Sequence, residues 1–397
     1  MVLQTTKFRQ LLSDQSLDAA LVSSIPNIIY LTGFAGFSPI EREAYLLITK
    51  QQTYLFSDGR YTTAVKEIPG ITVVEILSEN PFTSLLLEIA VKHKLSRIGF
   101  EANDLTVSEY AQMKKAIKHR RLVPAKNIHL IRMKKSADEI TKIQKACLLA
   151  DTALKALVPV IKLGITEKQL AWELEKRIKK HGAELSFPSI VAFGKNSAVP
   201  HHHTSGQRLM TNDIVLIDFG VRYENYCSDM TRTFFIGRSN AEQKKMYQTV
   251  LTAQQKAVEL INNSLKQYSS SEAQAKSRSK FSINQRSLRG SNNKTVKLSA
   301  VDSVARKYII SKVYPSIPYS LGHGIGIEVH EAPRLSPKSD DILEEGMVFS
   351  IEPGTYLPAG RQGIPPCGVR IEDLFAIKNG KLVQLTMSPK QFFKANI

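Results

Sequence analysis

The amino-acid sequence predicts an α/β (α+β) protein built from two domains, and three observations support this. Its 397 residues, 43% hydrophobic and 23% charged, can bury a sizeable core and exceed the length of an average single domain. Short β-rich apolar runs alternate with helical stretches over residues 1–130, as in α/β domains. Near Ile131 this alternation gives way to a long amphipathic region. We therefore expect a first domain at 1–130 and a second domain at 131–397.

Strands and helices can be placed in order along both domains. In the first domain, the runs Ala44–Thr49 and Thr53–Ser57 predict two strands joined by a three-residue turn. The second domain opens with a helix from Ser136 to Ile161, because Ser136 and Glu139 match a capping box and apolar residues follow at helical spacing. Three more helices are predicted by the same criteria, at 166–181, 241–262 and 300–311.

The composition argues against membrane spans and disulfide bonds. No apolar run approaches the roughly 18 residues of a membrane-spanning helix, and the first residues lack the basic-then-apolar order of a secretory signal. The cysteines Cys147, Cys227 and Cys367 are far apart and odd in number, so they indicate neither a disulfide framework nor paired zinc ligands. We expect a soluble, cytoplasmic protein with no membrane partner.

The formal net charge of +18 raises the question of nucleic-acid binding. Residues 264–299 hold eight Lys or Arg, one acid and ten serines, whereas the remaining excess of basic residues is dispersed. Such a stretch cannot bury enough apolar surface to offset the entropy lost on ordering, so we interpret 264–299 as a flexible insertion in a helix pair. Because no aromatic and basic stripe accompanies the dispersed charge, we expect no nucleic-acid partner.

Two aspartates lie on either side of a predicted β-hairpin. The segment 213–236 alternates apolar and polar residues around a turn near its middle. A turn centred between residues 223 and 224 would place Asp218 directly opposite Asp229. Like charges so placed, with Cβ atoms about 5 Å apart, are unfavourable unless a cation lies between them. Either aspartate alone is equally well explained as a turn or edge residue.

A histidine and two further acids occupy settings that suit metal ligands. His323 lies between glycines, which let the backbone bring the ring close to another group, although a single histidine is more often an ordinary polar residue. Glu352 and Glu372 end apolar runs, where a buried charge is costly unless it is paired or coordinated. Arg370 points to the same strand face as Glu372 and can orient that carboxylate or bind substrate.

Together these residues form an oxygen-rich, hard ligand set: Asp218, Asp229, His323, Glu352 and Glu372. Such a set suits Mn²⁺, Co²⁺ or Fe²⁺ and also accepts Zn²⁺. Because two divalent ions neutralise four carboxylates and one ion does not, we expect two ions per subunit, with Mn²⁺ foremost. In two-metal hydrolases the ions lie roughly 3.5–4 Å apart and share a water whose pKa falls toward neutrality.

Four motifs follow one another along the second domain: Asp218-Phe-Gly with Ser228-Asp229-Met-Thr-Arg-Thr, Gly322-His323-Gly-Ile-Gly-Ile-Glu-Val-His330-Glu331, Ser350-Ile-Glu352-Pro353-Gly354, and Gly368-Val-Arg370-Ile-Glu372-Asp373. Together they resemble the proline-specific pita-bread metallopeptidases, the Xaa-Pro aminopeptidases and prolidases. Asn27–Phe34 and Tyr54–Tyr61 look like the non-catalytic first domain of those enzymes, and Asn196–His202 looks like their histidine loop. The resemblance covers nearly the whole chain.

The resemblance implies a creatinase-like first domain, a pita-bread catalytic domain and an exopeptidase acting on Xaa-Pro bonds in dipeptides or at peptide N-termini. The five ligands would be those named above, with Asp229 and Glu372 shared by both ions and Glu352 also acting as general base. His330 and His201 would bind the substrate and stabilise the tetrahedral oxyanion. Groups that orient the ligands or contact the substrate would be Arg370, Tyr356 and His202. The partners implied are a proline-containing peptide and a second copy of the chain, in a homodimer.

Three features depart from the family pattern: the insertion 264–299, a long segment at 357–367, and an additional histidine, His203. Other interpretations remain open. A metal-free or catalytically silent relative, either a creatinase-like hydrolase or a peptide-binding module, should lack some of the five ligands. A methionine aminopeptidase should lack the first domain. A nucleic-acid-binding role would depend on the insertion and would show strong salt dependence.

Overall fold

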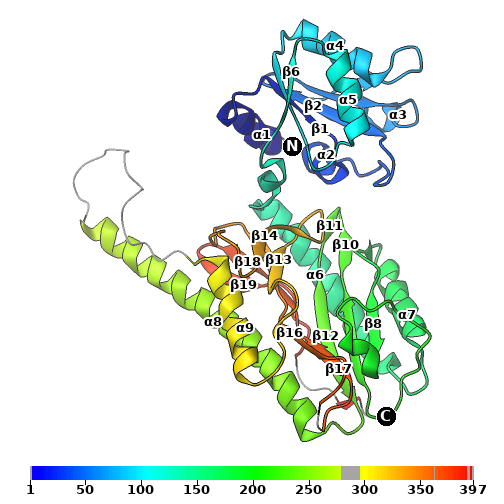
Figure 1. Ribbon diagram of the computed structural model, residues 1–397, viewed down its shortest axis with the longest axis vertical. Coiled ribbons are helices and arrows are strands. Elements are labelled where there is room, and N and C mark those ends of the chain that lie inside the picture. The colour runs from blue at the N-terminus through cyan, green and yellow to red at the C-terminus, as the bar shows by residue number, and fades with distance from the viewer. Residues whose placement is uncertain (1, 279–295, 362, 391–393, 396–397) are drawn as a thin grey trace. The chain divides into compact units, whose positions relative to one another are not determined.

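The computed structural model describes residues 2–278, 296–361, 363–390 and 394–395, and the chain divides into two compact units, Met1–Arg132 and Met133–Ile397 (Figure 1). The elements of the first unit are α1 (Val2–Asp14), β1 (Ala19–Val22), α2 (Ile25–Thr32), β2 (Ala44–Thr49), β3 (Thr53–Ser57), α3 (Thr62–Val65), β4 (Thr72–Glu75), α4 (Phe82–Lys92), β5 (Arg97–Phe100), α5 (Val107–Ala116), β6 (Arg121–Pro124) and the 3₁₀ helix η1 (Ile128–Arg132).

The first unit is built around a six-stranded mixed sheet in the order β4-β3-β2-β1-β5-β6. The predicted strand pair is confirmed, because β2 and β3 run antiparallel with Ala44 opposite Ser57. β1 pairs with β2 antiparallel and with β5 parallel, so the sheet changes direction at its centre. Apolar residues of α4 and α5 pack with residues from these strands in one buried core.

The second unit carries the remaining elements. They are α6 (Ala137–Leu157), η2 (Val158–Val160), α7 (Glu167–Lys180), β7 (Glu184–Leu185), β8 (Ile190–Phe193), η3 (Gly194–Ala198), β9 (Ile214–Phe219), β10 (Val221–Tyr223), β11 (Tyr226–Cys227), β12 (Met230–Ile236), α8 (Ala241–Arg278), α9 (Leu298–Ser311), β13 (Gly322–Gly324), β14 (Glu331–Leu335), β15 (Val348–Ile351), β16 (Gly354–Leu357), β17 (Cys367–Arg370), β18 (Asp373–Lys378), β19 (Lys381–Gln384) and β20 (Lys394–Ala395). The strands form four sheets, ordered β11-β10-β7, β20-β12-β9-β8, β14-β13-β15-β18-β19 and β16-β17.

The two predicted helices at the start of this unit are confirmed. α6 begins at the Ser136 cap, whose side chain accepts from the Glu139 N–H while the Glu139 side chain reaches back to the Ser136 N–H. α7 starts with the same arrangement at Thr166. It ends before Gly182, which takes a φ of +70° that a side chain would strain.

Each pair of helices packs against a different set of strands. α6 and α7 share a buried core with β8, β9 and β12, and α8 and α9 share another with β15, β17 and β18. On β9, Val215, Ile217 and Phe219 belong to the first of these cores. Because strand residues alternate between faces, Asp218 points away from α6 and α7. Its carboxylate therefore faces the other half of the unit.

The register predicted for the hairpin was wrong by two residues. Asp218 on β9 lies opposite Thr231 on β12, not opposite Asp229. The turn residues are Glu224 and Asn225, both with positive φ (45° and 70°), which makes a tight two-residue hairpin turn one position later than expected. A shift of two keeps every side chain on its face, so Asp229 stays on the same side as Asp218 as a diagonal neighbour.

The interpretation of 264–299 as a flexible insertion was also wrong in part. α8 continues through Arg278, because no Gly or Pro interrupts the chain between Ala241 and Arg278. Residues 279–295 lie outside the described residues, and α9 begins at Leu298. Within the described ranges, none of the helices combines the length and apolar character that a membrane crossing requires.

Candidate metal centre

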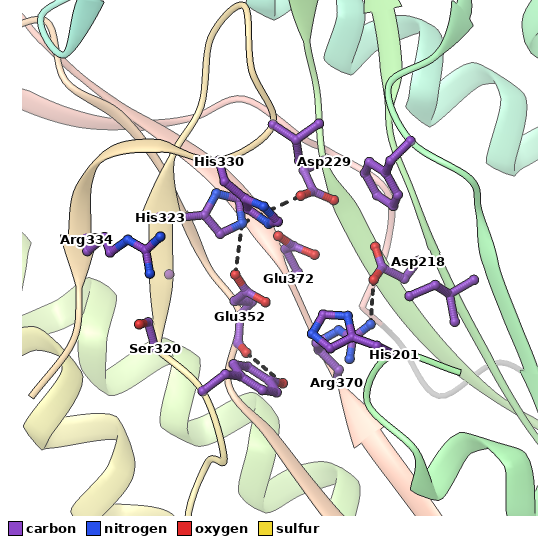
Figure 2. A pocket seen from close by; sticks show the side chains of 15 residues that line it. His201, Asp218, Asp229, Ser320, His323, His330, Arg334, Glu352, Arg370 and Glu372 are labelled. Atoms are coloured by element: carbon purple, nitrogen blue, oxygen red, sulfur yellow. Dashed lines mark hydrogen bonds and ion pairs between the residues drawn. The ribbon is translucent and has the colours of Figure 1, made fainter. Parts of the chain in front are cut away.

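A cavity of about 410 Å³ in the second unit brings the five predicted ligands together (Figure 2). His201, His330 and Arg370 line the same cavity. The lining residues that the sequence did not single out are Phe187, Ile190, Tyr319, Ser320, Gly322, Val329 and Arg334. Such a volume is within the range of small-molecule sites.

Each predicted ligand comes from a strand or from a residue that directly adjoins one. Asp218 is on β9, Asp229 precedes β12, and His323 is the middle residue of β13. Glu352 follows β15, and Glu372 lies between β17 and β18. The strands of two different sheets thus converge on one point, which places the acids on rigid elements.

His323 presents one ring nitrogen to the acids. Its Nδ1 lies 3.0 Å from the Gly324 carbonyl, which accepts a hydrogen bond from the Nδ1–H. Its Nε2 faces the acids, at 3.1 Å from Glu352 Oε1 and 3.7 Å from Asp229 Oδ2. A proton or a metal ion between this nitrogen and the carboxylate oxygens would stabilise the contact, and Asp229, His323 and Glu372 can each place a ligand atom within 4.8 Å of the others.

Three buried carboxylate oxygens of the cluster have no hydrogen-bond partner among the described residues: Asp218 Oδ1, Asp229 Oδ1 and Glu372 Oε1. Asp229 and Glu372 are only 4% and 1% exposed. Leaving a buried acceptor without a partner costs roughly 1–3 kcal/mol, and more when it is charged. The residues present therefore fit divalent cations, which would satisfy these oxygens.

The electrostatics of the acids support the same conclusion. Burial, followed by the neighbouring charge of Glu372, holds the pKa of Asp229 well above its ordinary value. Burial and the Glu352 charge do the same to the pKa of Glu372. Burial also raises the pKa of Asp218, against the opposing effect of Arg370. Protein groups alone do not stabilise all of these acids in their charged forms, and a metal ion reverses this balance.

Arg370 connects the ligand Asp218 to groups behind it. Its Nη2 donates to Asp218 Oδ2, its Nε donates to Thr231 Oγ1 at 3.0 Å, and its Nη1 donates to the Tyr356 hydroxyl at 2.6 Å. Thr231 in turn donates to Glu372 Oε2 at 2.7 Å. Tyr356 therefore stands behind Arg370 and is not among the cavity-lining residues. The sequence did not single out Thr231, although its position two residues after Asp229 puts it on the same strand face.

The histidines divide between the cavity and the scaffold. The His330 ring lies edge-on to the His323 ring, with centroids 4.4 Å apart, and His201 lies near Arg370 and Asp218 in Figure 2. The prediction for His202 needs correction. Its Nε2 lies 2.9 Å from the buried Glu167 carboxylate, and His202 is not among the residues that line the cavity. Of these two neighbouring histidines, only His201 lines the cavity.

The long segment between β16 and β17 lies away from the cavity. None of its described residues, 358–361 and 363–366, lines the cavity. Arg361 instead donates to the Val313 carbonyl at 2.6 Å. The segment is therefore not part of the cavity wall.

Comparisons with known proteins agree with this geometry. Residues 4–134 match the creatinase/prolidase N-terminal domain, and residues 141–276 and 284–379 match metallopeptidase family M24. The uncharacterized peptidase YqhT of Bacillus subtilis is 32% identical over 389 residues, which cover 97% of this chain and 98% of the relative.

Solved structures extend the comparison to the fold. An Xaa-Pro dipeptidase from Bacillus anthracis aligns with a TM-score of 0.83 and 29% identity over 99% of each chain. An X-Pro aminopeptidase from Thermotoga maritima aligns with a TM-score of 0.77 and 32% identity over 96% of this chain and 98% of that one. The predicted fold, a creatinase-like α/β domain followed by a pita-bread domain, is confirmed. The chain belongs to metallopeptidase family M24, in the group of Xaa-Pro peptidases and prolidases, and is a metal-dependent peptidase by fold and by family.

Proposed function

We propose that this protein is an exopeptidase that hydrolyses Xaa-Pro bonds with two divalent metal ions, Mn²⁺ foremost, held by Asp218, Asp229, His323, Glu352 and Glu372. One observation carries the proposal. Four buried carboxylates and one imidazole converge on a cavity, and three of their oxygens lack any other partner in the described residues. When bound, divalent cations supply Lewis acidity, which polarises the scissile carbonyl and acidifies water.

The charge of the cavity favours two ions over one. The four ligand carboxylates carry −4, and Arg370, which is buried against Asp218, offsets one of these charges. One divalent ion would leave −1, and two ions would leave +1, which a single small anion such as hydroxide balances. A buried charge is costly unless it is compensated in this way.

The chain's own residues supply the remaining chemistry. Glu352 is placed to take a proton from the attacking water, because its Oε1 is held by the Ser350 hydroxyl at 3.0 Å and its carboxylate faces the cavity. His201 and His330 both line the cavity and would bring N–H donors to the scissile carbonyl oxygen. Fixed donors of this kind stabilise the developing oxyanion.

The cavity walls favour a short peptide with a proline ring. Phe187, Ile190 and Val329 provide apolar surface, which suits a pyrrolidine ring and makes no demand for the N–H that an Xaa-Pro bond lacks. Arg334 brings an exposed guanidinium to the same cavity and is suited to a terminal carboxylate. We therefore propose that Xaa-Pro dipeptides are better substrates than longer peptides. The Bacillus anthracis relative, named an Xaa-Pro dipeptidase, supports this choice.

A cytoplasmic homodimer completes the proposal. It is supported by the resemblance to a family that is usually dimeric, and light scattering of the purified full chain would test it. The alternative of a metal-free or catalytically silent relative is disfavoured because all five ligands line one cavity. A methionine aminopeptidase is disfavoured by the match of residues 4–134 to the creatinase/prolidase N-terminal domain.

The deciding experiment combines metal replacement with a substrate series. The full chain is stripped with a chelator, Mn²⁺, Co²⁺ or Zn²⁺ is added back singly, and Ala-Pro, Ala-Pro-Ala and Ala-Ala are assayed together with elemental analysis. We expect two ions per chain, activity restored by Mn²⁺, the highest kcat/KM for Ala-Pro, and little cleavage of Ala-Ala. Full activity after stripping, or equal cleavage of Ala-Ala and Ala-Pro, would contradict the proposal.

A further inference from the structure

Asp373 directly follows the proposed ligand Glu372 and is also buried, but it differs from Glu372 in having hydrogen-bond donors for both carboxylate oxygens. Glu372 is 1% exposed and keeps an oxygen without a hydrogen-bond partner in the described residues, whereas Asp373 is 0% exposed and accepts two hydrogen bonds on each oxygen. The donors lie 2.7 to 3.0 Å away and are Arg232, Thr386, Gln254 and Lys390. These five residues are called the Asp373 node. With its oxygens occupied in this way, Asp373 serves as a structural centre and not as a further ligand.

The Asp373 node is joined to the backbone at two proposed ligands. Arg232 Nη1 donates to the carbonyl oxygen of Glu372 at 2.5 Å. Gln254 Nε2, on α8, donates to the carbonyl oxygen of Ile351 at 3.0 Å, and Ile351 directly precedes Glu352. Any movement of the node therefore displaces the chain at Glu352 and Glu372 together.

Half of the contacts that fix the node come from the segment 385–390, which follows β19. Thr386 and Lys390 donate to the central carboxylate, and the Ser388 carbonyl accepts from the Arg232 guanidinium at 3.2 and 2.7 Å. On its other side the segment is held by Asp151 on α6. The Asp151 carboxylate accepts from the N–H groups of Met387 and Ser388 at 2.8 and 2.7 Å and from the Ser388 hydroxyl at 2.6 Å.

Polar contacts hold this segment in addition to packing, because Leu385, Thr386 and Ser388 are buried. Met387 is 70% exposed, and the segment borders an apolar cavity of about 590 Å³ between itself and α6. Substitutions that remove only the polar groups of Thr386 or Lys390 should loosen the segment while the buried Leu385 stays packed. Neither the segment nor the Asp373 node lines the metal cavity, so any effect on the metals has to pass through the backbone of the ligands.

We propose that the segment 385–390 is a positioning element of the metal centre, which sets the spacing of Glu352 and Glu372 through the Asp373 node. The inference rests on the proposed function, because it takes these two glutamates as metal ligands. Groups that orient metal ligands typically change metal affinity or activity by roughly 10–100-fold when they are removed. Thr386, Lys390 and the Ser388 carbonyl are thus positioning groups and do not contact the substrate.

The test uses the full chain with Mn²⁺ as the probe. Lys390→Met removes the ammonium and keeps the aliphatic length, and Thr386→Val removes one hydroxyl at constant shape. Lys381→Met is the matched control, because Lys381 is exposed on β19 and forms no ion pair in the described residues. Mn²⁺ affinity is measured by calorimetry and the spin coupling of the two ions by electron paramagnetic resonance, well below each variant's Tm.

We expect Lys390→Met and Thr386→Val to bind Mn²⁺ about tenfold or more weakly and to alter the coupled Mn²⁺ spectrum. Lys390→Arg should restore both properties, and Lys381→Met should match the wild type. Unchanged affinity and spectrum in both Lys390→Met and Thr386→Val would overturn the inference, whereas a wild-type protein that binds no Mn²⁺ would overturn the proposed function itself.

Discussion

Glu101 in the first unit and Asp229 in the second differ in what surrounds their carboxylates, not in how deeply they are buried. Glu101 in the first unit is 8% exposed, and its carboxylate accepts hydrogen bonds from two backbone N–H groups, the Ser24 hydroxyl and the Asn27 amide. Asp229 in the second unit is 4% exposed, and its Oδ1 has no partner in the described part of the chain. Burial raises the pKa of both acids.

The difference shows that a cluster of unsatisfied carboxylate oxygens is a better indicator of a functional site than a buried charge. Glu101 binds the N-terminal end of α2, where donors are left over, and its role is structural. In the proposed metal centre, by contrast, three carboxylate oxygens have no hydrogen-bond donor in the described residues. Buried polar atoms are nearly always paired in native proteins, so those that are not require an explanation.

The largest expected effect comes from neutralising one acid of the metal centre. Asp229→Asn should abolish retention of both ions and lower kcat/KM by about 10³-fold or more, the scale on which electrostatic stabilisation acts in active sites. The metal-free variant should be as stable as the metal-free wild type or more so, because one of several like charges is removed. Elemental analysis, steady-state kinetics and thermal unfolding measure these three effects.

The matched control is Glu101→Gln in the first unit. There the substitution turns an acceptor into an amide that meets existing N–H donors, so we expect a loss of about 1–3 kcal/mol of stability. Metal content should be unchanged. If Asp229→Asn behaves like Glu101→Gln and keeps its two ions, the distinction between the two acids is wrong.

The next largest effect distinguishes the proposed ligand His323 from the neighbouring His330. His330 lines the same cavity and packs edge-on against His323, with ring centroids 4.4 Å apart. His330→Ala should lower kcat by about 10²-fold, as loss of one oxyanion donor does, while both ions stay bound. Elemental analysis of the variant beside its kinetics provides the measurement. Loss of metal from His330→Ala would mean that the two histidines have exchanged roles.

Most of this centre could be predicted from the sequence because its chemistry is local. Glycines flank His323, and Glu352 and Glu372 break apolar runs, so each was visible without the fold. The hairpin register was missed by two residues, although Asn225 gave a signal, since Asn tolerates the positive φ of a tight turn. The error did not change the predicted face of either aspartate, because a shift of two residues returns every side chain to the same side of the strand.

Other parts of the centre depend on tertiary contacts that leave no local pattern. Tyr319 lines the cavity and also bonds Tyr356, 37 positions along the chain. His202 resembles His201 in sequence but turns to Glu167, on α7. The Asp373 node joins α8, β12 and the segment 385–390, and no spacing in the sequence predicts that meeting.

A smaller effect, on KM, is expected for Arg334, which differs from Arg42 in its charged partners. Arg42 in the first unit is paired with Asp104 and Glu109, whereas Arg334 in the metal cavity forms no ion pair with an acid in the described ranges. If Arg334 binds the substrate carboxylate, Arg334→Ala should raise KM for Ala-Pro by about tenfold, the scale of one charge-assisted hydrogen bond. The amide Ala-Pro-NH₂, which has no carboxylate, should be cleaved equally by variant and wild type. An equal rise in KM for both substrates would assign Arg334 a structural role.

The smallest effect concerns pH and the paired acid Glu109. Burial opposes its ionisation, but hydrogen bonds from Arg42 and Thr106 lower the pKa of Glu109 to about 2. A carboxylate with a depressed pKa stabilises the fold at pH above its unfolded value, roughly 4.3, and loses this contribution as the pH falls toward its folded value. Because the pair is partly exposed, we expect about 1–2 kcal/mol, lost between roughly pH 4.3 and 2.

Glu109→Gln isolates this contribution, because Gln still satisfies the capping box of α5 and carries no charge. Urea unfolding of the full chain and of the variant at a series of pH values gives the difference in the free energy of unfolding, from which the other acids cancel. That difference should shrink steadily as the pH is lowered from 5 to 2.5. A difference in the free energy of unfolding that is constant with pH would show that the charge of Glu109 does not contribute to stability. The contacts of Glu109 with Arg42 and Thr106 would then stabilise the first unit through hydrogen bonding alone.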